Sequence, residues 1–182
     1  PSRFWTLEEV VQGYILTPYF APGAGWHYSN TNYTLLTMII RLITNSDYPA
    51  LFRNRFFASL GMNESFVEMG DTITAPFAHN WVLSGSQLID AYGYPRTAFT
   101  SSAYGPGGVI SRPENMLRWL KALYGGQILS GSMLDQMLTF VNANISGANG
   151  YGLGTMRYSV NGKICWGHAG NSFGAEPLQH SA

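Results

Sequence analysis

Charged side chains are scarce in this sequence. They make up 11% of its 182 residues, against about 25% in a typical globular protein. Ten basic residues are balanced by ten acidic ones, and lysine occurs only at Lys121 and Lys163. A chain without net charge or a basic stripe lacks the electrostatic footprint of a nucleic-acid or anionic-membrane partner. The low charge instead favours an extracytoplasmic enzyme, or a chain that buries extra surface against a partner.

Cysteine, long apolar runs and metal-ligand patterns are also lacking. The single Cys165 excludes an internal disulfide and leaves the redox compartment open. The longest apolar run, near residues 35–43, is too short to span a bilayer. The four histidines have no metal-ligand spacing, and neither H-E-x-x-H nor a Walker A sequence occurs. The sequence therefore implies no metal or organic cofactor.

The most informative stretch is residues 25–43, where a polar cluster leads directly into an apolar segment. Gly25-Trp26-His27-Tyr28-Ser29-Asn30 comes first, and Ser29 or Asn30 occupies the N-cap position of the helix that follows. Tyr28 is therefore expected just outside a helix N-terminus, where a phenolate is stabilised and can act as a general base. The three- and four-residue spacing of apolar positions predicts that one side of the helix is buried. That side comprises Leu35, Leu36, Ile39, Ile40 and Ile43.

Local signals along the rest of the chain predict an α+β fold. Thr6 and Glu9 form a capping box that starts an early helix, and the apolar spacing from Ser132 predicts a later helix that extends to Val141. Asn161-Gly162 between alternating segments is the strongest short hairpin signal. We expect a mainly helical region over residues 1–150, an irregular insertion at 62–110 with a short strand near 77–83, and an antiparallel hairpin at 151–175. Residues 176–182 are expected to form a polar tail.

Two motifs can carry chemistry: Tyr28-Ser29-Asn30, which opens the predicted helix, and His168-Ala169-Gly170, which ends the second strand of the hairpin. In this order they resemble the penicillin-recognising serine hydrolases, which include class C β-lactamases, D-alanyl-D-alanine carboxypeptidases, and related esterases and D-aminopeptidases. That superfamily combines S-x-x-K, which carries the nucleophile, with Y-x-N or S-x-N and with K-T-G or H-x-G on a strand. The likeness continues between the two motifs, at Leu60-Gly61-Met62, Gly107-Gly108-Val109-Ile110-Ser111 and Tyr151-Gly152-Leu153-Gly154.

The resemblance implies a role for each motif residue. Tyr28 corresponds to the base, or part of a proton relay, that activates a serine hydroxyl for acyl transfer. Asn30 would orient the amide carbonyl of the substrate, and His168 would place the substrate and assist proton movement. Both motifs are then expected to line one groove.

The strand end supplies the substrate-binding positions Ala169, Gly170 and Asn171. By resemblance, the backbone N–H of Asn171 is a donor to the oxyanion that develops during acyl transfer. The substrate implied is a small molecule or peptide: a D-amino-acid peptide, a β-lactam or an ester. A periplasmic or secreted location is also implied.

Three departures from the superfamily pattern matter. No S-x-x-K occurs in the sequence, so the nucleophilic serine and its lysine are missing from these residues. The likeness ends at Ala175, where the superfamily has further strands, so the chain resembles an internal fragment that is inactive in isolation. Ala169 replaces a hydroxyl residue that contacts a substrate carboxylate, which favours an esterase or peptidase over an efficient β-lactamase.

Three functions remain open at this point. The first is part of a serine acyl-transfer hydrolase, which rests on the order of the motifs. The second is a non-catalytic scaffold that keeps the helical region, which rests on the missing serine and lysine. The third is an assembly module, because an isolated hairpin over residues 151–166 has open edges that favour a homo-oligomer.

Overall fold

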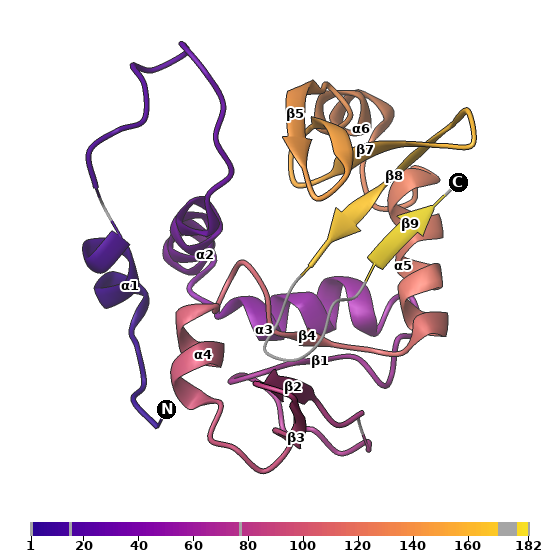
Figure 1. Ribbon diagram of the computed structural model, residues 1–182. Coiled ribbons are helices and arrows are strands. Elements are labelled where there is room, and N and C mark those ends of the chain that lie inside the picture. The colour runs from indigo at the N-terminus through magenta and orange to yellow at the C-terminus, as the bar shows by residue number, and fades with distance from the viewer. Residues whose placement is uncertain (1, 15, 77, 171–177, 182) are drawn as a thin grey trace. The chain divides into compact units, whose positions relative to one another are not determined.

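The computed structural model describes residues 2–14, 16–76, 78–170 and 178–181 (Figure 1). The chain forms two compact units, Pro1–Asn115 and Met116–Ala182. Helices and antiparallel sheets are both present, so the predicted α+β class is confirmed. The boundary expected between residues 150 and 151 falls inside a strand of the second unit, β6 (Ala148–Tyr151).

The helices of the first unit follow the local signals in the sequence. They are α1 (Leu7–Tyr14), α2 (Asn30–Thr44), α3 (Tyr48–Phe52) with the π-helical turn η1 (Arg53–Phe57), and α4 (Thr97–Ser102). The capping box is confirmed, because the Thr6 N–H donates to Glu9 Oε2 at 2.9 Å and the Glu9 N–H donates to Thr6 Oγ1 at 3.1 Å. Helix α1 packs on α2.

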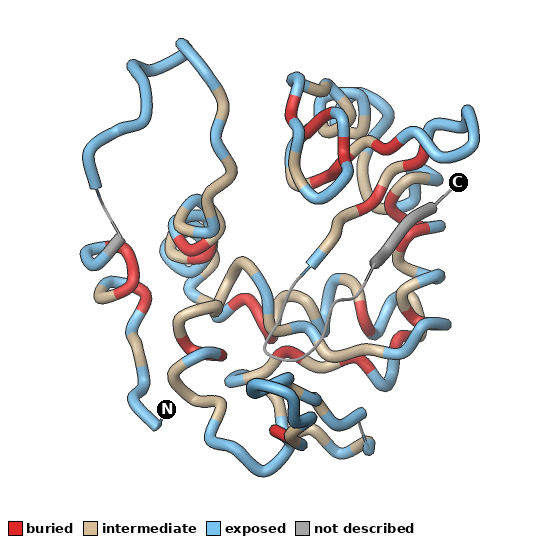
Figure 2. The backbone as a smooth tube through the Cα atoms, viewed as in Figure 1, coloured by how far each residue is buried: buried red, intermediate tan, exposed pale blue. Residues whose placement is uncertain are grey.

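The burial of α2 differs from the prediction. Leu35, Leu36, Ile39 and Ile43, which were expected to be buried, are exposed by 41–77%, and Ile40 is only half-buried. The buried positions are Thr34 and Thr37 (Figure 2). The physical reason is local, since the elements of the first unit that pack on α2 meet its threonine side. The apolar spacing identified the helix correctly but assigned the wrong side to the core.

Residues 62–110 contain more regular structure than expected. Strand β1 (Phe66–Val67) pairs with β4 (Val109–Ile110), and β2 (Trp81–Ser84) pairs with β3 (Gln87–Asp90). The short strand expected near residues 77–83 is thus confirmed as part of a hairpin. Its turn includes Gly85, whose φ of +62° lies in the left-handed region that favours glycine. Helix α4 belongs to the same segment.

The second unit is built on a five-stranded antiparallel sheet in the order β5-β6-β7-β8-β9. Its strands besides β6 are β5 (Val141–Ile145), β7 (Met156–Val160), β8 (Lys163–Ala169) and β9 (Leu178–Ser181). Helices α5 (Pro113–Tyr124), which begins in the first unit, and α6 (Gly131–Met137) precede it. The buried side chains in this unit include Leu120, Tyr151, Met156, Tyr158 and Cys165.

Two expectations for this unit are corrected. The helix from Ser132 was expected to reach Val141, but α6 ends at Met137 and Val141 pairs with Tyr151 in the sheet. Residues 176–182 were expected to form a polar tail without a strand, yet residues 178–181 form β9 and pair with β8. In both cases backbone pairing with a neighbouring strand decided the structure, and the side-chain pattern did not reveal it.

The hairpin at Asn161-Gly162 is confirmed. Val160 pairs with Lys163, and Asn161 and Gly162 have φ values of +50° and +77°, as a type I′ turn requires. The hairpin is not exposed at its edges, however, because β6 and β9 pair with its outer sides. The edges of this hairpin, which were expected to be open, are therefore paired within the chain. Over the described residues, no helix combines the length and apolar character needed to cross a membrane.

Candidate active site

Tyr28 and Asn30 lie where the chain enters α2. Asn30 is the first residue of the helix and is exposed, while Ser29 occupies the N-cap position with φ −149° and ψ 121°. The Ser29 side chain makes no capping hydrogen bond, although its carbonyl accepts from the Asn32 N–H at 3.3 Å. Tyr28 is half-buried directly before the cap. The predicted placement of the phenol beside a helix N-terminus is therefore confirmed.

The segment before Tyr28 is held by aromatic contacts. The His27 ring stacks on Tyr19 with centroids 3.9 Å apart, and its Nδ1–H donates to the Tyr28 carbonyl at 2.7 Å. A Cβ atom at Gly25 would lie 3.0 Å from the Phe20 ring, so glycine permits close approach there. These contacts restrict the backbone at Tyr28 and hence the direction of its side chain.

The electrostatics at Tyr28 differ from the expectation. Burial raises the pKa of Tyr28 above its usual value, and the neighbouring phenol of Tyr33 adds to the rise. The helix N-terminus was expected to stabilise the phenolate, but in this environment desolvation outweighs it. Tyr28 is consequently a neutral phenol near pH 7.

His168 lies near the end of β8, next to Gly167, which pairs with Met156 on β7. Both ring nitrogens have partners within the second unit. Nδ1 lies within hydrogen-bond distance of the Ala169 carbonyl, and Nε2 lies 3.0 Å from the hydroxyl of Tyr151. The two rings meet edge to face, with centroids 5.8 Å apart. The imidazole orientation is therefore set from both sides.

The protonation state of His168 follows from these contacts. Burial lowers the pKa of His168 below 6.5, and the hydrogen bond to the Ala169 carbonyl opposes this effect only in part. A carbonyl can only accept, so Nδ1 carries the proton in the neutral ring and Nε2 accepts from the Tyr151 hydroxyl. His168 is thus a neutral imidazole near pH 7.

The rest of the His-Ala-Gly motif forms the end of the strand. Ala169 is half-buried, and its N–H points to Met156 Sδ at 3.5 Å. Gly170 follows and is exposed. Asn171, expected to donate to the oxyanion, lies outside the described residues. Over its described residues, Ala169 and Gly170, the strand end thus presents backbone groups and a methyl group and no side-chain hydroxyl.

The candidate residues fall into two groups. Tyr28 and Asn30 belong to the first unit, and His168, Ala169 and Gly170 belong to the second. Each group is local: the first sits at the start of α2, and the second at the end of β8. That the two groups line one groove stays a prediction from the sequence.

A glycine-rich loop packs against α2 at Tyr33 and Thr37. Gly105 has a φ of +110°, and a Cβ atom there would lie 2.4 Å from Thr37 Oγ1 and 3.0 Å from the Tyr33 carbonyl oxygen. The ring of Tyr104 contacts that of Tyr48, with centroids 4.6 Å apart. Loop and helix can approach this closely only because residue 105 has no side chain.

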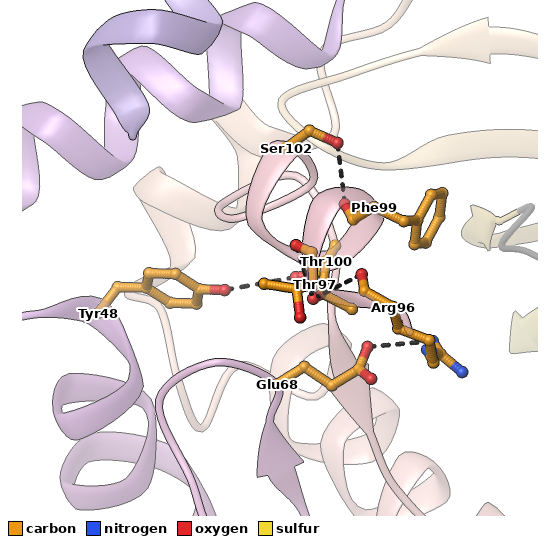
Figure 3. A network of polar contacts seen from close by, with 8 residues as sticks. Tyr48, Glu68, Arg96, Thr97, Phe99, Thr100 and Ser102 are labelled. Carbon is orange, nitrogen blue, oxygen red and sulfur yellow. Dashed lines mark hydrogen bonds and ion pairs between the residues drawn. The ribbon is translucent and has the colours of Figure 1, made fainter. Parts of the chain in front are cut away.

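An ion pair lies next to the same loop, because the backbone N–H of Glu68 donates to the Gly108 carbonyl. Arg96 Nη2 lies 3.2 Å from Glu68 Oε2, and the two side chains are only 22% and 13% exposed (Figure 3). Tyr48 donates to the Gly107 carbonyl at 3.4 Å, and Thr100 donates to the Arg96 carbonyl at 3.1 Å. Burial raises the pKa of Glu68, although Arg96 acts in the opposite direction. The ion pair thus joins the residue after β1 to the N-cap of α4, and Tyr48 joins α3 to the loop at Gly107.

A pocket of about 430 Å³ lies elsewhere in the first unit, between η1 and β1. Its lining includes Arg53, Phe57, Met62, Ser65 and Asp71, and none of the candidate residues. The buried Asp71 carboxylate pairs with Arg53 and also accepts from the Val67 N–H. Within the described ranges, no three histidine, cysteine, aspartate or glutamate side chains gather in a way that could hold a metal ion.

Tyr151 is the residue that sequence reasoning missed. It was noted only as part of Tyr151-Gly152-Leu153-Gly154, yet its hydroxyl contacts His168. No local pattern predicts that contact, because it depends on the register of three strands. Tyr151 pairs with Met156, and Met156 pairs with Gly167.

Comparison with known proteins defines the class. The family model described as Beta-lactamase matches residues 14–177, so the chain belongs to the β-lactamase family. This confirms the resemblance to serine β-lactamases and penicillin-binding proteins. A penicillin-binding protein of Bacillus subtilis (strain 168) is 27% identical over 149 residues, which are 76% of this chain and 33% of that protein.

Solved structures give the same result. A D-stereospecific amidohydrolase from Streptomyces sp. is 28% identical with a TM-score of 0.82, and the match covers 95% of this chain and 52% of that one. The D-amino acid amidase from Ochrobactrum anthropi SV3, solved with D-phenylalanine, is 26% identical with a TM-score of 0.83 and coverages of 94% and 52%. The chain spans about half the length of these solved relatives.

Proposed function

We propose that this chain supplies the Tyr-x-Asn and His-x-Gly elements of a serine hydrolase that cleaves D-amino-acid amides or esters without a free carboxylate through an acyl-enzyme. The observation that carries the proposal is the family match over residues 14–177, a range that includes Tyr28, Asn30 and His168 in the order of the family. The likeness to an amidase that was solved with D-phenylalanine supports the substrate class.

The chemistry at the end of β8 supports a substrate that has no free carboxylate. His168 is neutral, and Ala169 has no hydroxyl to donate to a carboxylate. The lysine of this strand, Lys163, is at its other end, about 20 Å away at the usual rise per residue. A substrate carboxylate would find neither a cation nor a hydroxyl on this strand end, whereas an amide or ester needs neither.

Tyr28 is proposed as the group that takes the proton of the nucleophilic serine. Its pKa is raised by burial, so it needs a nearby cation to become an effective base. In the family this cation is the lysine of S-x-x-K, and these 182 residues contain no such motif. We therefore propose that the chain does not turn over substrate in isolation.

The remaining groups are proposed to bind the substrate. Asn30, exposed at the first turn of α2, would donate to the amide carbonyl of the substrate and orient it. The backbone N–H of Asn171 would donate to the oxyanion, where a fixed donor lowers the barrier without reorganisation.

A chimera tests this proposal. These 182 residues replace the matching half of the Ochrobactrum anthropi amidase, whose remaining half is kept, and hydrolysis of D-phenylalanine amide is measured. The chimera is expected to hydrolyse this substrate, and Tyr28→Phe is expected to lower kcat by about 100-fold or more, as loss of a general base does. Tyr19→Phe is the matched control, since it removes a hydroxyl but keeps the ring that stacks on His27.

The outcome is decided by the comparison of these variants. A folded chimera whose kcat is insensitive to Tyr28→Phe would show that Tyr28 is not the base. Covalent labelling of the isolated 182-residue chain by a fluorophosphonate or β-lactam probe would show that the chain has a nucleophile of its own, contrary to the proposal.

A non-catalytic scaffold is the second candidate, and the absence of S-x-x-K favours it. Under this alternative the chain keeps the family fold but takes no part in acyl transfer. A folded chimera that binds D-phenylalanine but shows no turnover would support it.

A further inference from the structure

We infer that Tyr151 is a positioning residue for His168, and that its hydroxyl orients the imidazole by donating a hydrogen bond to Nε2. Its catalytic consequence rests on the proposed function, whereas the positioning itself does not. The inference starts from the contact between the Tyr151 hydroxyl and His168 Nε2 at 3.0 Å.

The strand register brings these two residues together. Tyr151 on β6 pairs with Met156 on β7, and Met156 pairs with Gly167 on β8. Strands two apart are separated by about 9.6 Å, so a long side chain is needed to reach from β6 to the ring next to Gly167. A tyrosine places a hydroxyl at that distance on a rigid ring.

The Ala169 carbonyl determines which group is the donor in the hydrogen bond between Tyr151 and His168. The Ala169 carbonyl accepts from Nδ1, which requires the proton of a neutral ring to be on Nδ1. Nε2 then has a lone pair, and the Tyr151 O–H is the group that donates to it. Rotating the ring by half a turn would break both hydrogen bonds at once.

The contact is also shielded from water. Tyr151 is 6% exposed, and His168 is half-buried. A hydrogen bond in such surroundings is stronger than one in water, and leaving its acceptor unpaired costs more. Tyr151 therefore fixes the orientation of the imidazole, while the Ala169 carbonyl fixes its tautomer.

The first test is an NMR measurement on the 182-residue chain. Long-range ¹H–¹⁵N correlations of the histidine rings report the tautomer, and His168→Gln identifies the signals of His168. The wild-type ring is expected to be the Nδ1–H tautomer, with Nε2 unprotonated at pH 7. Finding the Nε2–H tautomer in the wild type would overturn the inference without any variant.

The second test compares two phenylalanine variants. Tyr151→Phe removes the donor, so the Nε2 resonance of His168 is expected to shift and the ring to lose its single orientation. Tyr124→Phe is the matched control, because the Tyr124 hydroxyl contacts Thr155 Oγ1 and its ring lies against Trp166. Unchanged His168 signals in folded Tyr151→Phe would refute the positioning role, as would an equal change in Tyr124→Phe.

Kinetics in the chimera separate this inference from the proposed function. Tyr151→Phe is expected to lower kcat by about tenfold, the effect of one hydrogen bond, with KM little changed. If the chimera is inactive while the NMR result holds, the proposed function fails and the positioning role stands. If the chimera is active but its kcat is unchanged by Tyr151→Phe, the positioning of His168 by Tyr151 does not contribute to catalysis.

Discussion

Thr34 and Ile43 lie on opposite faces of α2, and the threonine is the buried one. They are nine residues apart, about two and a half turns, and their exposed fractions are 1% and 77%. The apolar stripe of the helix is thus turned away from the elements of the first unit that cover its threonines. This arrangement makes the stability of the isolated chain insensitive to the stripe.

Polar substitutions on the stripe test that statement. Ile43→Gln is expected to change the free energy of unfolding of the 182-residue chain by no more than about 0.5 kcal/mol, as exposed substitutions do. Leu35→Gln, at a position 41% exposed, is expected to cost about 1 kcal/mol. Leu120→Gln, at a position 8% exposed in α5, is the control and is expected to be strongly destabilising. Urea denaturation measures all three. A loss above about 2 kcal/mol at Leu35 or Ile43 would mean that the stripe is covered.

The buried threonine should tolerate loss of its hydroxyl. Thr34 Oγ1 is buried and has no hydrogen-bond partner among the described residues, so Thr34→Val is expected to stabilise the chain by about 1 kcal/mol. Thr37→Val is the matched control, because the Thr37 hydroxyl donates to the Tyr33 carbonyl at 2.9 Å. In thermal unfolding, Tm is expected to be higher than that of the wild type for Thr34→Val only. A lower Tm for Thr34→Val would contradict the assignment of the Thr34 hydroxyl as a buried group without a hydrogen bond.

Gly105 should be far less replaceable than Gly85. Both have positive φ, but only at Gly105 would a Cβ atom meet Thr37 and the Tyr33 carbonyl oxygen; at Gly85 it meets open space. Gly85→Ala is expected to cost about 1 kcal/mol for the left-handed conformation alone. Gly105→Ala is expected to cost about 1–3 kcal/mol more, because the loop must move off α2. Equal losses of unfolding free energy for Gly85→Ala and Gly105→Ala in chemical denaturation would contradict the close contact between Gly105 and α2.

The Glu68–Arg96 pair should show strong coupling. Glu68→Gln or Arg96→Met alone leaves the other partner poorly compensated in a mostly buried site, which is expected to cost about 3 kcal/mol. The double variant is expected to cost less than the sum of the two, since no unpaired charge remains. A double-mutant cycle on unfolding free energies measures the difference. Simple additivity would show that the pair does not interact.

Acid should destabilise the chain partly through His168. The pKa of His168 is lowered by burial, so below about pH 6.5 the unfolded chain binds more protons than the folded one. The stability that the neutral His168 gives the folded chain is therefore fully present above about pH 6.5, and it is lost as the pH falls towards the lowered pKa. Comparing unfolding free energies at pH 7.5 and 5.5 should show a smaller loss in His168→Gln than in the wild type. An identical pH dependence would contradict the shift.

Local chemistry allowed much of the fold to be predicted. The Thr6–Glu9 capping box and the Asn161-Gly162 turn depend only on neighbouring residues, and both are confirmed. The start of α2 at Asn30 was likewise predicted from a polar cluster followed by apolar spacing. The side of α2 that is buried depends on which elements pack on it, which no helical pattern specifies.

Several of the missed features depend on strand pairing. Val141 continued an apolar helical spacing but belongs to β5, and the Ser146-Gly147 turn, with φ values of +50° and +78°, was the overlooked hairpin signal. The role of Tyr151 beside His168 required the register of β6, β7 and β8. The sequence identified the two motifs of the candidate site but not the residue that holds one of them in place.

The most direct test of the account is a crystal structure of the 182-residue chain grown with D-phenylalanine amide. Tyr28 and the His168–Gly170 strand end are predicted to line one groove and to face the ligand from two sides, with Asn30 on its carbonyl. Two motifs on opposite surfaces, with no shared groove between them, would contradict the proposed active site whatever the assays show.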